Sequence, residues 1–168
     1  MNSQSQMLML HEIAALKADP AFPKRLLSSY RMMLDFYGMQ LADPKTGRVV
    51  RGANYRARYA HLNRSTHNYL RITRILKCLG ELGQEHLKLG FLLLIVREIT
   101  LNELKPASVG RSAVNYCQLN SVHTMSAAAV DRSDRLILTA SLPVFFRACC
   151  AQGSPRFVPR LIALVSNL

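Results

Sequence analysis

Tryptophan is absent from this chain of 168 residues, and so is any apolar run long enough to cross a bilayer. The longest unbroken apolar stretch runs from Phe91 to Val96, whereas a membrane-spanning helix needs about 18 or more such residues. The apolar group at Met7–Leu10 is too short for a secretory signal, and no charged segment precedes it. We therefore expect no transmembrane segment, and at most a peripheral association with membranes.

Motifs for metal binding and catalysis are also missing. The four cysteines follow no zinc-binding spacing, and the five histidines form no HExxH pair. The chain has no GxSxG elbow, no glycine-rich phosphate loop after a strand, and no acid–histidine–nucleophile set. We expect four free thiols in a reducing compartment, surface or capping roles for the histidines, and no metal, cofactor or catalytic residue. The thiols are Cys78, Cys117, Cys149 and Cys150.

Acidic residues are few, with 10 Asp and Glu against 22 Lys and Arg, which gives a net charge of +12. Between Lys45 and Lys77 there are no acidic residues at all, although this stretch holds nine basic ones. Such an excess favours anionic partners, namely nucleic acid, anionic lipid or acidic protein segments. A solvated basic face on a domain without such a partner would explain the same composition.

Apolar periodicity predicts an all-α fold, a compact bundle of about five helices. We expect helices over residues 8–18, 23–38, 54–62, 63–83 and 84–104, with a turn at 43–47 and a polar loop after it. No alternating strand pattern of useful length appears before residue 105. The stretch from Phe91 to Val96 is compatible with a buried strand, but its length with its flanks favours a helix at the centre of the core.

The long helix predicted over 63–83 is strongly amphipathic. Ser65 is a candidate N-cap, and Gly83 supplies the left-handed residue that commonly ends helices. One arc is apolar, formed by Tyr69, Ile72, Ile75, Leu76, Leu79 and Leu82. The opposite arc is basic, formed by His67, Arg71, Arg74 and Lys77.

The basic arc is the candidate ligand-binding site. His67, Arg71 and Arg74 recur at i, i+4 and i+7, so their side chains form one stripe that Lys77 extends. Such a stripe is suited to hold phosphates or the C-terminal carboxylate of a peptide. A solvated face opposite a buried one accounts for the same pattern. Four upstream arginines, Arg48, Arg51, Arg56 and Arg58, widen the basic surface if their segment folds beside this helix.

Two tyrosines lie among those upstream arginines. Tyr55 and Tyr59 could stack on nucleic-acid bases, but their helical spacing favours packing in the core. Beyond residue 105 the charge density falls and the periodicity fades. We therefore predict a helical domain at 1–105 and an irregular, poorly ordered tail at 106–168.

Three segments of the chain carry a resemblance. The second helix ends Leu34-Asp35-Phe36-Tyr37-Gly38, residues 54–63 fit N-x-x-x-R-[FY]-x-x-L-N, and residues 67–83 read HNYLRITRILKCLGELG. In this order and with these gaps, the segments resemble the opioid growth factor receptor family over about residues 10–104. Cys78 stands where that family usually has serine. Family members carry an upstream aromatic portion with a tryptophan, so this chain is expected to be N-terminally truncated.

The resemblance implies an opioid growth factor receptor-like protein without catalytic activity. Its expected ligand is an enkephalin-type opioid peptide linked to growth regulation. Its expected location is intracellular, in the nucleus and cytoplasm and associated with perinuclear membranes. The alternative function is a nucleic-acid or chromatin adaptor, or a binder of acidic protein, that uses the Lys45–Lys77 surface. The steep salt dependence of phosphate binding separates the nucleic-acid alternative from peptide binding.

Overall fold

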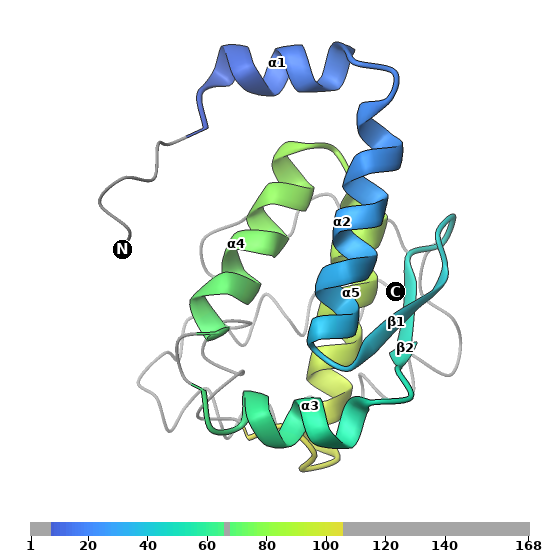
Figure 1. Ribbon diagram of the computed structural model, residues 1–168, viewed down its shortest axis with the longest axis vertical. Coiled ribbons are helices and arrows are strands. Elements are labelled where there is room, and N and C mark those ends of the chain that lie inside the picture. The colour runs from blue at the N-terminus through green and yellow to red at the C-terminus, as the bar shows by residue number, and fades with distance from the viewer. Residues whose placement is uncertain (1–7, 66–67, 106–168) are drawn as a thin grey trace, which may run out of the picture.

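The computed structural model describes residues 8–65 and 68–105. Figure 1 shows a layered arrangement in which α2 lies in front of α5, α4 flanks them on one side and a β-hairpin on the other. Helix α3 crosses one end and α1 the other. The elements are α1 (Leu10–Ala18), α2 (Phe22–Phe36), β1 (Met39–Asp43), β2 (Arg48–Arg51), α3 (Tyr55–Leu62), α4 (Asn68–Glu81) and α5 (Glu85–Thr100).

The all-α prediction is wrong in one respect, because residues 39–51, for which we expected only the 43–47 turn and part of a polar loop, form a β-hairpin. Strands β1 and β2 pair antiparallel, with Leu41 opposite Val49. Met39, Leu41 and Val49 are buried while Gln40, Ala42 and Arg48 are exposed. This alternation spans only four or five residues in each strand, which is too short to stand out from the surrounding helical periodicity.

The turn predicted at residues 43–47 is confirmed as the tip of this hairpin. The side chain of Asp43 accepts hydrogen bonds from the Lys45 amide, at 2.9 Å, and from the Thr46 hydroxyl, at 2.8 Å. The Gly47 amide donates to the Asp43 carbonyl at 3.0 Å, and Gly47 has a φ of 77°. Because only glycine adopts that conformation at little cost, the turn chemistry in the sequence is what closes the hairpin.

Five helices are present in the described ranges, as predicted, but two of their boundaries differ from the expected ones by three residues or more. Helix α4 begins at Asn68 rather than at residue 63. Ser65 follows α3, where its amide donates to the His61 carbonyl at 3.0 Å, and its role as an N-cap stays a prediction because residues 66–67 lie outside the described ranges. Helix α5 ends at Thr100 rather than at residue 104, because Asn102 adopts a left-handed φ of 57° that the helix cannot continue through.

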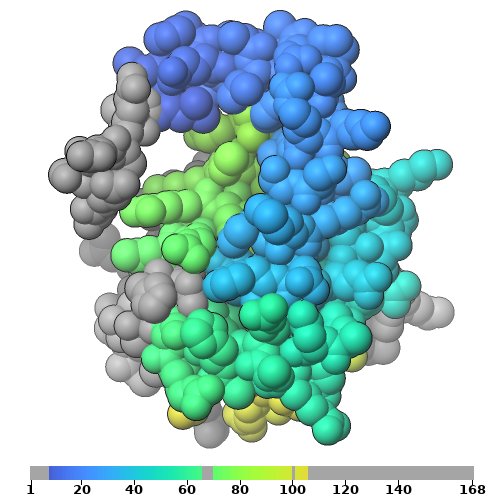
Figure 2. Space-filling model, in the orientation of Figure 1, coloured from blue at the N-terminus to red at the C-terminus, as the bar shows by residue number. Residues whose placement is uncertain are grey.

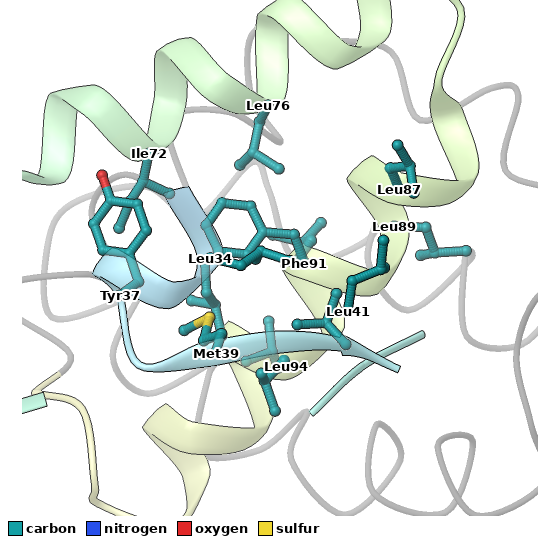
Figure 3. Packing of buried hydrophobic residues seen from close by; sticks show 14 of the residues in the cluster. Leu34, Tyr37, Met39, Leu41, Ile72, Leu76, Leu87, Leu89, Phe91 and Leu94 are labelled. Carbon is teal, nitrogen blue, oxygen red and sulfur yellow. The ribbon is translucent and has the colours of Figure 1, made fainter. Parts of the chain in front are cut away.

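Helix α5 forms the centre of the core. The stretch from Phe91 to Val96 is helical, as predicted, and its side chains are buried except for the partly buried Leu93. The ring of Phe91 contacts Tyr30 on α2 and Tyr37 just after its end, with ring centroids 6.3 and 6.1 Å away, respectively. Figure 3 shows Tyr37 and Phe91 between α4 and β1. A helix that is apolar all round is buried on every side.

The described part of the predicted apolar arc, from Ile72 to Leu82, is buried or partly buried, whereas the side chain of Tyr69 lies outside the description. Ile72 and Leu76 have no exposed surface, Leu79 is buried, and Ile75 packs against the edge of the core. Figure 3 shows Ile72 and Leu76 pointing from α4 toward the side chains of α2 and α5. This packing fixes which face of α4 remains in solvent.

Two core tyrosines differ in how their hydroxyls are satisfied. The Tyr30 hydroxyl donates to the Leu87 carbonyl at 2.9 Å, whereas the buried Tyr37 hydroxyl has no partner in the described part of the chain. We expect Tyr30→Phe to lower the free energy of unfolding by about 1 kcal/mol, since it removes this buried hydrogen bond. Tyr37→Phe removes an unsatisfied group and should be neutral or stabilising by about 1 kcal/mol. Urea unfolding of both variants checks this; equal losses would contradict it.

No helix within residues 8–65 and 68–105 is long and apolar enough to span a membrane. The irregular tail predicted for 106–168 lies outside the described residues, and the division of the chain at residue 105 stays a prediction.

Candidate binding surface

The candidate stripe lies on the solvent face of α4. Arg71, Arg74 and Lys77 are all exposed, on the side of the helix opposite Ile72 and Leu76. The spacing therefore brings these three cations to one surface, as predicted. The fourth candidate, His67, lies outside the described residues.

Acidic residues leave most of this stripe unneutralised. The ion pairs in the described ranges involve Asp19, Glu85, Glu98 and Glu103, and none includes Arg74 or Lys77. Arg71 lies toward the seam with α2, where its charge acts on the Tyr37 hydroxyl. Burial raises the pKa of Tyr37 to about 12, and the Arg71 charge opposes that rise.

Arg51 has a structural task rather than a binding one. Its Nε and Nη2 donate to the Glu98 carboxylate at 3.0 and 2.7 Å, and Glu98 is completely buried. The guanidinium also lies 4.7 Å from the centre of the Tyr55 ring and 3.6 Å from Glu103. Hydrogen bonding to Glu98 raises the pKa of Arg51 further above its usual value. This contact joins β2 to α5, so Arg51 is not available to an external ligand.

The basic surface does not extend from the hairpin to α4. Arg48 and Arg51 would widen the basic surface only if their segment folded beside α4. That segment is the hairpin, and it lies on the opposite side of α2 and α5 from α4 (Figure 1). On α3, Arg56 donates to the Tyr55 hydroxyl at 3.2 Å, and Arg58 lies 6.0 Å from the centre of the Phe36 ring. The acid-free stretch is therefore distributed over separate surfaces.

The tyrosines of α3 pack in the core, as their spacing favoured. Tyr59 is buried, Tyr55 is partly buried against the core, and their rings meet edge to face with centroids 5.5 Å apart. Burial, with a contribution from the Glu98 charge, raises the pKa of Tyr59. These rings are not displayed for stacking on bases.

Within the described residues, no group of three potential metal ligands comes together. Cys78 is a free, exposed thiol at the margin of the buried face of α4, and partial desolvation raises its pKa. The other three cysteines fall outside the ranges that the structure describes.

One exposed residue of this surface, Leu70, was not among the residues predicted for the site. Leu70 lies one helical turn before Arg74 and is 62% exposed. Its exposure could have been predicted, since a helical wheel places position 70 opposite Ile72 and Leu76 rather than with the other leucines of the helix. The surface thus offers cations and one large apolar side chain, an arrangement suited to bind an amphipathic anion.

Known proteins similar to this chain place it in a family. The conserved region of the opioid growth factor receptor matches residues 1–129, beyond the 10–104 range recognised from motifs. The mouse opioid growth factor receptor is 44% identical over 115 residues, which make up 68% of this chain and 18% of that protein. Mouse opioid growth factor receptor-like protein 1 is 43% identical over 116 residues, 69% of this chain and 25% of that protein.

The human opioid growth factor receptor is 41% identical over 115 residues, 68% of this chain and 17% of that protein. The match thus spans a quarter or less of the length of these relatives. No solved structure matches the chain. Because the conserved region covers more than half of its residues, this chain belongs to the opioid growth factor receptor family.

Proposed function

We propose that the chain is a non-catalytic binding module for an enkephalin-type opioid peptide and that it acts in growth regulation. The observation that carries the proposal is family membership, since the matching relatives are named receptors for opioid growth factor. We further propose that it acts in the nucleus and cytoplasm, with a peripheral association at perinuclear membranes.

The proposed site is the basic face of α4, formed by Arg71, Arg74 and Lys77, with His67, which precedes the helix, as its fourth proposed member. The three described members are exposed on a helix whose opposite face is locked into the core. A rigid support of this kind reduces the ordering that binding requires. Charge-assisted hydrogen bonds from guanidinium groups to a peptide carboxylate supply the recognition.

Calorimetric titration of the full chain with an enkephalin pentapeptide tests this function. We expect saturable binding at micromolar peptide, weakened about tenfold in Arg74→Glu/Lys77→Glu because the reversed charges repel the carboxylate. Reversal of Arg31, an exposed cation on α2, serves as the control and should leave the affinity unchanged. Absence of saturable binding to the unmodified chain would reject the proposal.

A nucleic-acid or chromatin adaptor is the second candidate, supported by the unneutralised cations of α4. Fewer basic residues are available for it than the sequence suggested, because Arg51 is paired with Glu98. Binding to phosphates weakens steeply between about 50 and 200 mM salt. Titration with a single-stranded oligonucleotide at both salt concentrations, on the unmodified chain and on Arg71→Glu/Arg74→Glu, distinguishes the two functions.

A further inference from the structure

The outermost line of α4 combines one apolar side chain with two cations. Leu70, Arg74 and Lys77 follow one another at i, i+4 and i+7, directly opposite the buried Ile72 and Leu76. Leu70 is 62% exposed, and both cations are exposed. In Figure 2 the side chains of α4 project from one flank of the molecule. This line is what α4 presents to an incoming ligand.

The charges on this line are available for binding in the described part of the molecule. Neither Arg74 nor Lys77 forms an ion pair with any residue of 8–65 or 68–105. Glu81 is exposed one turn beyond Lys77 and pairs with neither cation. The surface therefore has the charge to attract an anionic group.

The spacing of the apolar and charged groups selects a kind of anion. Side chains four residues apart on a helix have Cβ atoms about 5–6 Å apart. The last residue of a peptide carries its side chain and its carboxylate on the same Cα, so an apolar group and a negative charge lie side by side there, as Leu70 and Arg74 do on the helix. An apolar terminal side chain can cover Leu70 while its carboxylate accepts hydrogen bonds from Arg74 and Lys77.

We propose that Leu70, Arg74 and Lys77 form a subsite for the C-terminus of a peptide whose last residue is apolar and whose carboxylate is free. This inference rests on the proposed peptide-binding function and specifies which end of the peptide is recognised. A nucleic-acid backbone offers phosphates but no aliphatic group for Leu70, and bases stack on aromatic rings rather than on leucine. The pairing of a leucine with cations thus favours the peptide.

Two enkephalin pentapeptides ending in methionine test the subsite, one with a free carboxylate and one amidated. With the full chain, we expect amidation to weaken binding about fivefold, which is the range for partly exposed charge pairs. Arg74→Ala should weaken the free acid more than the amide and so reduce the advantage of the acid, while Lys77 retains part of it. Leu70→Ser should weaken both peptides by about threefold, because each loses the same apolar contact.

Matched controls lie on α2, where Arg31 and Met32 are exposed in the same way and Met32 is 65% exposed. Arg31→Ala and Met32→Ser should leave both affinities unchanged.

Equal binding of acid and amide, or an unaltered preference in Arg74→Ala, would overturn the subsite while leaving the proposed function standing. Failure of both peptides to bind would reject the function and the subsite together. If neither peptide bound and an oligonucleotide bound in a way that depends on Arg74, the ligand of this surface would be nucleic acid rather than a peptide.

Discussion

Replacing Gly47 with alanine should lower the free energy of unfolding by about 3 kcal/mol. Gly47 has a φ of +77°, and a Cβ added there would lie 2.1 Å from the His86 carbonyl oxygen and 2.5 Å from its carbon. These atoms belong to the backbone at the start of α5, so they cannot move aside as a flexible side chain does. The hairpin would have to separate from the helix, which loses the packing of Leu41 and Val49.

Gly83→Ala is the matched control for this substitution. Gly83 has nearly the same φ, +76°, but a Cβ there meets nothing within 4 Å. Gly83→Ala should lower the free energy of unfolding by only about 1 kcal/mol, the cost of a left-handed backbone conformation for alanine. Urea unfolding of the two variants separates the close approach from the backbone conformation, and equal losses would show that the hairpin does not pack against α5 as described.

Replacing Arg51 with methionine should lower the free energy of unfolding by about 3 kcal/mol, since it leaves the buried Glu98 without its partner. Glu98→Gln should cost less, about 1 kcal/mol, because the guanidinium of Arg51 is 32% exposed and still faces Glu103. The two losses differ because Glu98 is buried and Arg51 is partly exposed: a charge left without its partner costs more where water cannot reach it.

The double variant Arg51→Met/Glu98→Gln closes the cycle for this pair. Its loss should be smaller than the sum of the two single losses, because no charge remains buried without a partner. Thermal or urea unfolding of all four proteins measures the coupling. Additive losses, or an Arg51→Met protein as stable as the unmodified one, would contradict a structural role for this contact.

The helices and the apolar face of α4 could be predicted because their signals are local. Ile72, Leu76 and Leu79 recur with the period of a helix, and Gly38 and Gly83 mark helix ends through their freedom to adopt positive φ. The long apolar stretch of α5 needed only its length to be assigned to the core. Each of these inferences uses residues within about two turns of one another.

The hairpin and the fate of Arg51 depend on contacts between distant residues, which periodicity does not encode. Met39 and Val49 alternate over too few positions to outweigh the flanking helices. Arg51 lies 47 residues before Glu98, and nothing in the local pattern distinguishes it from the exposed Arg48. Leu70 was overlooked because a leucine within an amphipathic helix is usually buried.

The orientation of α4 is the feature on which the binding proposals depend, and solvent paramagnetic relaxation of methyl groups measures it directly. With a soluble paramagnetic agent and the methyl groups of isoleucine and leucine labelled, Leu70 should relax strongly while Ile72 and Leu76, on the same helix, are protected. If Ile72 and Leu76 relaxed as fast as Leu70, the apolar face would not be buried, and the basic face would have no fixed direction toward solvent.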